Sequence, residues 1–271
     1  MFAKTADMMS SKLRYFRISA AALVATLSFC SCSVLASIGW DSAGLASAAT
    51  KAMTAASISD EQIIQLSAQS VAQMDRQNTV DTGAYSQRLS KLLSGVQVDG
   101  LPLNFKVYKT QEVNAFACAD GSIRVYSGLM DVMEDGELMA IIGHEIGHVV
   151  HQDSKNSMKK AYLASAARDL IGSVGSVGAI SSAVLGDISE AFVQAKFSQK
   201  QEFAADEYGY EFSIRNNQSP YSMATALEKL VNMSQGQKAS AVAQMFSSHP
   251  DSALRAEKVR KKADDYTKNK K

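Results

Sequence analysis

The chain has 271 residues, of which 46% are hydrophobic and 20% are charged; this is the composition of a globular protein and not of a disordered or fibrous one. Its formal net charge is +1, and it becomes −2 when residues 1–31, with four basic residues and one acidic residue, are set aside. No basic field is left to attract a nucleic acid, so we expect no partner of that class.

The N-terminal residues resemble the signal of a bacterial lipoprotein. Basic residues precede an apolar stretch at 18–29, which has the length of a signal-peptide core and is short for a bilayer span. We therefore expect a signal peptide at 1–31, lipidation of Cys32, and an Ala- and Ser-rich tether over 32–57. This would anchor the protein to outer-membrane lipid on the periplasmic face. The alternative is cleavage after Ala36, which gives a soluble periplasmic or secreted protein.

A folded domain is expected over 58–265, followed by a polar tail at 266–271. Residues 59–62, Ser-Asp-Glu-Gln, have the spacing of a capping box, and apolar residues follow at mostly helical intervals. This pattern predicts a helix over 60–77. A second helix is predicted over 82–94.

The pattern then changes to alternation with a period of two. Residues 103–109 predict one strand, and residues 112–128 predict two strands joined by a turn at Asp120-Gly121. Cys118 is the single cysteine of this domain, so the fold must rest on its core and not on a disulfide. We expect an α+β fold, mainly helical, with a small sheet of about three strands.

From Asp135 onward the pattern is helical. Residues 135–152 begin with acids that suit the helix dipole and then stay apolar, which predicts a buried helix. The uncharged segment 170–186 could contact lipid, but its Ser and Gly content makes a poor spanning helix, and we favour a closely packed or mobile segment beside the active site. Three more helices are predicted, over 187–214, 220–233 and 251–265.

The stretch GHEIGHVVH, residues 143–151, contains three of the four histidines. His144 and His148 are four residues apart, so in a helix they share one face and can bind the same ion. Glu145 lies about 100° around the helix, where it can act as general base for a water at the metal. Unpaired polar side chains are costly to bury in an apolar helix, which favours a metal site over scattered surface histidines.

A third protein ligand is required for zinc. His151 lies near the same face, but one straight helix does not easily wrap three ligands around an ion, so we do not favour it. Glu202 and Asp206 are four residues apart in a predicted helix. Glu202 can complete a His2Glu set, and Asp206 can accept a hydrogen bond from the outer nitrogen of a histidine. The alternative is that both are solvated acids, like Glu207 and Glu211 nearby.

Three motifs together carry a family resemblance. HEIGH (144–148), EFAAD (202–206) and HPDSALR (249–255) resemble the gluzincin peptidases that include HtpX and the CAAX-prenyl endopeptidases. Residues 114–130 are similar to the edge strand and the start of the active-site helix of this family. The likeness covers about 58–262 and implies a zincin-like metallopeptidase domain, with the sheet beside the HEIGH helix.

The resemblance also implies the cofactor and the site. One zinc ion per chain would be bound by His144, His148 and Glu202, with Glu145 as the catalytic base and Asp206 supporting a ligand.

The resemblance further implies roles near the metal for His249 and Arg255. Either would stabilise the oxyanion, or His249 would occupy the open position of the metal at rest. The alternative is a helix-start turn at His249-Pro250 and a surface arginine.

A polypeptide that is to be cut must be extended, and an exposed sheet edge pairs with it through backbone hydrogen bonds. The strand at 112–118 or the one at 122–126 would serve, and we take Asn114, Ala115 and Phe116 as the substrate edge. Such pairing is largely indifferent to side chains, which suits a protease that acts on unfolded proteins.

The sequence therefore predicts a zinc-dependent endopeptidase of the bacterial envelope that hydrolyses extended or misfolded proteins. The role in protein quality control follows from the family resemblance alone. The rival prediction is a non-catalytic chaperone or assembly factor whose zinc is structural and closed by four protein ligands, with His249 or His151 as the fourth. Glu145 argues against the rival, because a structural site needs no carboxylate base.

Overall fold

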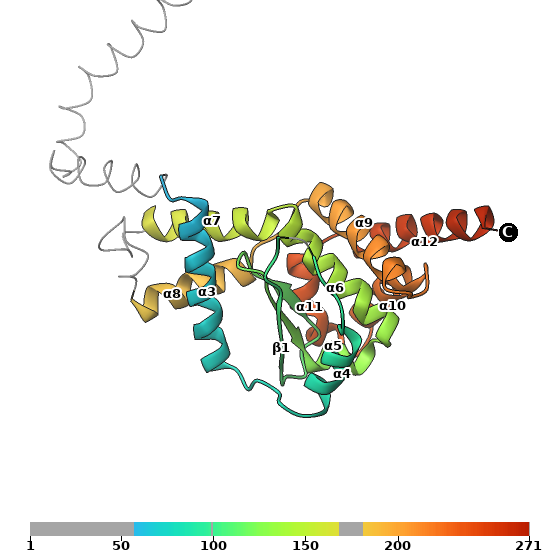
Figure 1. Cartoon of the computed structure of the whole chain (residues 1–271), viewed down its shortest axis with the longest axis horizontal. Coiled ribbons are helices and arrows are strands. Elements are labelled where there is room, and N and C mark those ends of the chain that lie inside the picture. The colour runs from blue at the N-terminus through green and yellow to red at the C-terminus, as the bar shows by residue number, and fades with distance from the viewer. Residues whose placement is uncertain (1–56, 99, 168–180, 271) are drawn as a thin grey trace, which may run out of the picture. The chain divides into compact units, whose positions relative to one another are not determined.

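The computed structural model describes residues 57–98, 100–167 and 181–270 (Figure 1). The predicted signal peptide, Cys32 and nearly all of the predicted tether lie outside these residues, as does most of the uncharged segment 170–186. Among the described helices, none is long and apolar enough to cross a membrane.

Three strands and ten helices make up the described part of the chain, and the sequence explains several of their ends. Ser59 caps the first helix in a capping box with Gln62, as predicted. Glu134 and Glu137 form the same kind of box at the start of the HEIGH helix. The elements are α3 (Asp60–Gln77), α4 (Ala84–Leu92), β1 (Asn104–Tyr108), β2 (Ala115–Ala117), β3 (Ser122–Tyr126), α5 (Ser127–Val132), α6 (Asp135–Val150), α7 (Asp153–Ala167), α8 (Ser182–Val193), α9 (Gln199–Arg215), α10 (Ser222–Ser234), α11 (Ala239–Ser248) and α12 (Ser252–Asn269).

The sheet has the order β1-β3-β2, with β1 parallel and β2 antiparallel to β3. Gly121 lies in the turn between β2 and β3 with a φ of 84°, a conformation that glycine adopts at no steric cost. The predicted α+β fold, mainly helical with a three-stranded sheet, is confirmed.

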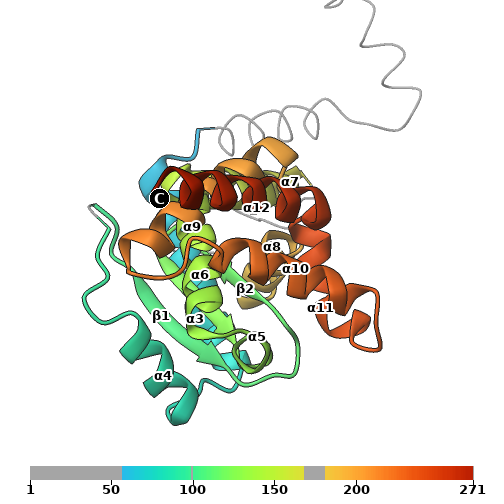
Figure 2. The ribbon, with the colours of Figure 1, turned by 90° about the vertical axis from the view of Figure 1, so that its right-hand side faces the viewer.

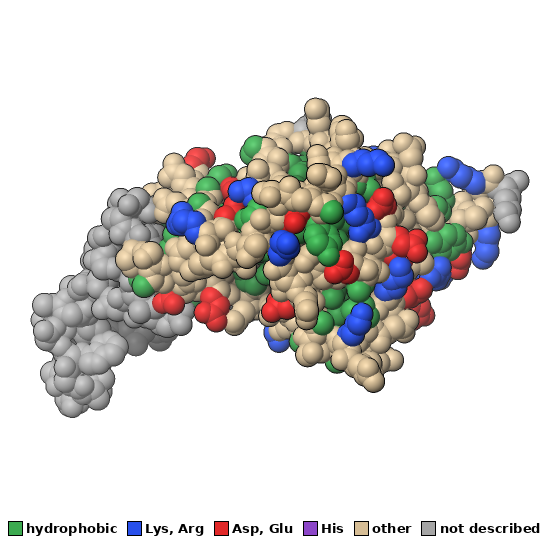
Figure 3. All heavy atoms as spheres, turned by 90° about the horizontal axis from the view of Figure 1, so that it is seen from below, with side chains coloured by type: hydrophobic (Ala, Val, Ile, Leu, Met, Phe, Trp, Pro, Cys, Tyr) green, Lys and Arg blue, Asp and Glu red, His purple; other side chains and the backbone are tan. Residues whose placement is uncertain are grey.

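The two faces of the sheet are covered by different helices and form two cores. On one face, Val107, Ile123 and Val125 pack with α6 and α10 (Figure 2). On the other face, Tyr108 and Phe116 pack with α3, α7 and α8 (Figure 1). Acidic and basic side chains are interspersed over the face of the molecule seen in Figure 3, as expected from the nearly balanced charge.

Helices α6 and α9 touch backbone to backbone, and glycines make this possible. A Cβ added at Gly143 would lie 2.7 Å from the ring of Phe212, and one added at Gly209 would lie 2.6 Å from the carbonyl oxygen of Ala140. Real atoms do not approach so closely, so only glycine fits at these positions. This contact places the start of α9 beside the histidines of α6.

The prediction of one long helix over 187–214 was wrong. The structure has two helices there, because α8 ends at Val193 and α9 begins after Ser198. Ser198 and Gln201 form a capping box, which is the start signal that the prediction overlooked. The break at 194–198 brings Phe197 against the site described below.

Three smaller predictions also need correction. Residues 127–130 belong to the separate short helix α5 and not to the start of the active-site helix, because Met133 is extended and interrupts the helix. Helices α7 and α11 were not predicted. Helix α12 continues to Asn269, so four residues of the expected polar tail are helical.

Candidate metal centre

The HEIGH residues lie in the C-terminal half of α6, which is buried almost all round. His144 and His148 are exposed by 1% and 0%, and Glu145 by 2%. Their burial follows from the apolar neighbours on α6 and from the close approach of α9.

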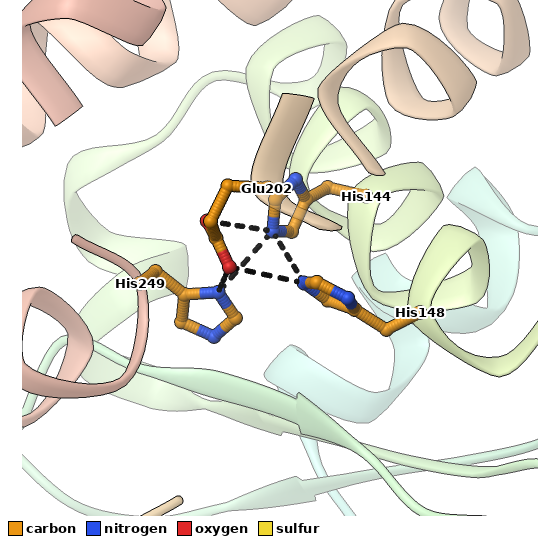
Figure 4. A group of neighbouring side chains, drawn as sticks. All are labelled: His144, His148, Glu202 and His249. Atoms are coloured by element: carbon orange, nitrogen blue, oxygen red, sulfur yellow. Dashed lines mark hydrogen bonds and ion pairs between the residues drawn. The ribbon is translucent and has the colours of Figure 1, made fainter. Parts of the chain in front are cut away.

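Glu202 and His249 approach these histidines from two other parts of the chain. Glu202 lies in the first turn of α9, and His249 follows the last residue of α11. One ligand atom from each of the four residues lies within 4.8 Å of all the others (Figure 4). The structure thus brings together the three predicted ligands and His249.

Four separations inside this cluster match those of a tetrahedral zinc site. Zinc–ligand bonds of 2.0–2.1 Å place neighbouring ligand atoms about 3.3 Å apart. The Nε2 atoms of His144 and His148 are 3.1 Å apart, and Nε2 of His144 is 3.3 Å from Nδ1 of His249. Oε1 of Glu202 is 3.4 Å from Nε2 of His148 and 3.1 Å from Nδ1 of His249.

The hydrogen bonds on the outer side of the rings show why a cation fits here. Nδ1 of His144 is 3.0 Å from a carboxylate oxygen of Asp206, and Nδ1 of His148 is 3.0 Å from one of Asp153. If each Nδ1 carries the proton of a neutral ring, both Nε2 atoms present lone pairs to each other and to the Glu202 carboxylate. A cation at the centre satisfies such a group, and a His–His–Glu donor set suits zinc.

Asp206 supports His144 as predicted from its spacing to Glu202, and Arg255 in turn holds Asp206. The Arg255 guanidinium donates to both oxygens of Asp206, at 2.7 and 2.6 Å, and is paired with Glu202. It also donates to the carbonyl oxygen of His249 at 3.4 Å. Arg255 is 2% exposed, so the surface arginine of the alternative prediction is excluded.

Asp153 is the site residue that the sequence analysis missed. It opens α7 directly after Gln152, whose φ of 63° turns the chain back toward His148. The other oxygen of Asp153 accepts a hydrogen bond from Gln201 at 2.6 Å, and Gln201 caps α9. A carboxylate five residues after the second histidine, at the end of a helix, was the available signal.

Two further side chains border the cluster. Oε1 of Glu145 is buried without a hydrogen-bond donor and lies 3.7 Å from Nε2 of His249. Phe197 stacks on His148 with ring centroids 3.9 Å apart and lies 5.3 Å from the ring of His249. By contrast, His151 is exposed and contacts Tyr208, away from the cluster.

Burial and ion pairing pull the pKa values of the cluster in opposite directions. Burial lowers the pKa of His144. Burial would also lower the pKa of His148, but its bonds with Asp153 and Glu202 outweigh this and raise it to about 9. Burial would raise the pKa of Asp206, yet the hydrogen bond from Arg255 holds it below the usual value.

The predicted substrate edge is β2, which is indeed at the edge of the sheet, whereas β3 lies in its centre. Asn114, Ala115 and Phe116 are nevertheless only 2%, 1% and 8% exposed. Phe116 packs in the core that includes α8, and the side chain of Asn114 accepts a hydrogen bond from the backbone N–H of Ala115. The edge is therefore covered in this conformation.

Comparisons with known proteins agree with this geometry. The profile of peptidase family M48 matches residues 80–263. Metalloprotease LoiP of Escherichia coli K12 is 42% identical over 225 residues, which are 81% of this chain and 88% of LoiP. Metalloprotease YcaL of the same organism is 38% identical over 219 residues, which are 79% of this chain and 85% of YcaL.

A more distant relative extends the likeness. A protease HtpX homolog of Thermococcus kodakarensis is 30% identical over 208 residues, which are 61% of this chain and 70% of that protein. The family match spans the HEIGH helix, the start of α9 and the residues after α11 that form the cluster. The chain therefore belongs to peptidase family M48 and is a zinc metallopeptidase.

Proposed function

We propose that the protein is an endopeptidase that hydrolyses peptide bonds of extended or misfolded proteins with Glu145 as general base. The observation that carries this proposal is the Glu145 carboxylate, which is buried beside the ligand cluster and has an oxygen without a hydrogen-bond donor. An unpaired carboxylate is costly to bury, and a purely structural zinc site has no use for it.

The chemistry follows from this placement. When bound, zinc supplies Lewis-acid polarisation of the peptide carbonyl and lowers the pKa of a water molecule. Glu145 accepts a proton from the attacking water as its oxygen bonds to the carbonyl carbon. The carbon–nitrogen bond then breaks, and Glu145 passes the proton to the leaving amine.

His249 and Arg255 have different places in this scheme. His249 lies within the ligand cluster, which supports its occupying a fourth position at rest, and its other nitrogen faces Glu145. Displaced from that position, the ring would be close enough to donate to the oxyanion. Arg255 is fully engaged with Asp206 and Glu202, so we propose that it positions those carboxylates and does not contact the oxyanion.

Substrate binding is proposed to use β2, because it is the free edge of the sheet next to α6. The covered state of this edge means that elements on it must shift before a polypeptide can pair. Displacement of the Asn114 side chain would release the N–H of Ala115 for the substrate.

We also propose that the protein works in the bacterial envelope, anchored to the outer membrane through lipidated Cys32, and removes misfolded proteins there. The basic and apolar residues before Cys32 and the similarity to LoiP and YcaL support this proposal. Replacement of Cys32 by Ser should release the protein from washed membranes. Retention of the variant on membranes would count against the anchor.

The test of the peptidase proposal is casein cleavage together with zinc content for the purified protein and its Glu145→Gln variant. We expect about one zinc per chain in both and a rate about 10²–10⁴-fold lower in the variant, the range for removal of a general base. Equal rates in both proteins would overturn the role of Glu145.

One zinc per chain and no cleavage by either protein would point to a site blocked by His249 or to the chaperone alternative. A His249→Ala variant separates these two. Gain of cleavage would identify His249 as the block, whereas continued inactivity on unfolded substrates would favour the chaperone.

A further inference from the structure

A cavity of about 1030 Å³ lies outside the metal centre, between α3, α8 and α11. The cavity is also lined by Glu112, which precedes β2, and by Tyr126, which ends β3. None of the zinc ligands lines this cavity, and the peptidase mechanism leaves it without a role.

The cavity begins beside the start of the edge strand, and α11 leads from its wall toward His249. The N–H of Val113, just before β2, donates to the carbonyl oxygen of Ala241 on α11 at 2.9 Å, and Ala241 lines the cavity. Gln244, also on its wall, donates to the carbonyl oxygen of Val193 at 3.0 Å. His249 follows Gln244 by five residues, which is about 7.5 Å along a helix.

The lining has an excess of negative charge. Among the described residues that line the cavity there are three exposed carboxylates and one basic side chain. The carboxylates are those of Glu112, Asp187 and Glu190, and the basic side chain is that of Arg76. Charge alone would not define a site, because exposed acids are common.

A second observation is independent of the charge. Gln73 lines the cavity and is 8% exposed, yet its side-chain oxygen has no hydrogen-bond donor. Its nitrogen donates to the carbonyl oxygen of Ser182 at 2.9 Å, which fixes the orientation of the amide. Gly186 lets α8 come this close, because a Cβ there would lie 3.2 Å from the same nitrogen. A buried acceptor held without a donor calls for a ligand that donates.

We propose that this cavity is a recognition site for a basic side chain, arginine or lysine, of the polypeptide substrate. The proposal rests on the peptidase function above and adds a sequence preference to it. A substrate pairing antiparallel with β2 leaves that strand near Val113, where the cavity begins. The basic residue therefore lies on the carboxyl-terminal side of the paired segment.

Fluorescence-quenched decapeptides that carry arginine, norleucine or glutamate at each position in turn provide the test. We expect kcat/KM to be about tenfold higher for arginine than for norleucine at one position, since each exposed ion pair adds a factor of roughly two to five. The preference should weaken as salt is raised.

The Asp187→Asn/Glu190→Gln double variant should lower this preference to about twofold and leave cleavage of the norleucine peptide unchanged. Gln73→Met keeps the side-chain length and removes the acceptor, and should lower the preference about threefold. The matched control is Glu257→Gln/Asp265→Asn, which removes two exposed carboxylates from α12 and should keep the preference.

Binding measured by fluorescence anisotropy in the Glu145→Gln protein gives a readout that does not need cleavage. The arginine peptide should bind more tightly than the norleucine peptide, and neutralising Asp187 and Glu190 should reduce the difference to about twofold. Equal binding of both peptides, or an undiminished preference in the double variant, would overturn the recognition site. Cleavage that depends on Glu145 without any basic preference would leave the proposed function intact and refute the site alone.

Discussion

Two groups of charged side chains, each built around buried residues, lie on opposite faces of the sheet, and they differ in whether protein atoms complete them. On the α3 side, Arg124 is 1% exposed and donates to both oxygens of Asp75, at 2.8 and 3.0 Å. Lys106 and Tyr108 donate to the same carboxylate, each at 2.7 Å. Both oxygens of the carboxylate accept from protein donors, so this group joins α3 to β1 and β3 without an added ligand.

On the α6 side, the nitrogens of His144 and His148 face each other and the carboxylate of Glu202. The outer sides of this group are satisfied by protein atoms, because Asp206 and Asp153 accept from the histidine Nδ1 atoms and Arg255 donates to Asp206, but the centre collects lone pairs. Burial of charge therefore does not by itself indicate a functional site. A functional site is indicated where inward-facing acceptor atoms lack donors although the outer atoms of the same side chains are held by hydrogen bonds.

The largest effect is expected when the complete group, formed by Asp75 with Arg124, Lys106 and Tyr108, is broken. Replacement of Asp75 by Ala leaves Arg124 buried beside Tyr108 without its carboxylate, and we expect the free energy of unfolding to fall by about 3–5 kcal/mol. Urea denaturation measures this loss. Zinc content should stay at one per chain, and loss of zinc in a folded variant would show that the two groups are not independent.

The next largest effect is expected when the carboxylates that orient the histidines of the incomplete group, the ligand cluster, are changed. Asp153→Asn and Asp206→Asn each remove the charge that orients a histidine, and zinc affinity should fall about 10- to 100-fold. Competition with a chromophoric chelator measures the affinity. Asp120→Asn, which changes a carboxylate far from the site in the β2–β3 turn, is the control and should bind zinc as tightly as the unaltered protein.

A smaller effect concerns the contact that positions the ligands. Ala at 209 would place a Cβ 2.6 Å from the carbonyl oxygen of Ala140 and 2.8 Å from the backbone nitrogen of His144. Helices α6 and α9 must then separate, which should cost about 1–3 kcal/mol of stability and also weaken zinc binding. Gly236→Ala is a matched change, since its Cβ would meet no atom nearer than 3.6 Å. Equal effects of the two variants would contradict the role of Gly209.

The smallest effect is a pH dependence of the complete group. Burial would raise the pKa of Asp75, but the hydrogen bonds from Arg124, Lys106 and Tyr108 lower it from 3.8 to about 2. A depressed pKa in the folded state contributes stability that is fully present above pH 3.8 and is lost as pH falls toward 2. The stability difference between the unaltered protein and Asp75→Asn should therefore shrink between pH 4 and pH 2 in urea titrations. A constant difference would contradict the ion-pair assignment.

Local signals predicted much of this fold. The capping box at Ser59 gave the start of α3, and the spacing of His144 and His148 placed both rings on one face. Helix ends without a noticed cap were placed wrongly, as the break before Ser198 shows.

The rest of the site depends on contacts between distant segments. His249 and Arg255 reach the cluster because α11 and α12 pack against α10, which itself packs on α6 and α9, and no local pattern encodes that approach. Asp153 depends on a single left-handed residue, Gln152, which turns the chain after α6. Such a turn is hard to predict when the residue is neither glycine nor asparagine.

Zinc affinity of the unaltered protein, Glu202→Gln and Asp75→Asn, measured side by side, tests the difference between the two groups most directly. We predict one zinc per chain with similar affinity in the unaltered protein and Asp75→Asn, and an affinity at least about 100-fold lower in Glu202→Gln. Tight zinc binding by Glu202→Gln, or its loss in a folded Asp75→Asn protein, would contradict the account.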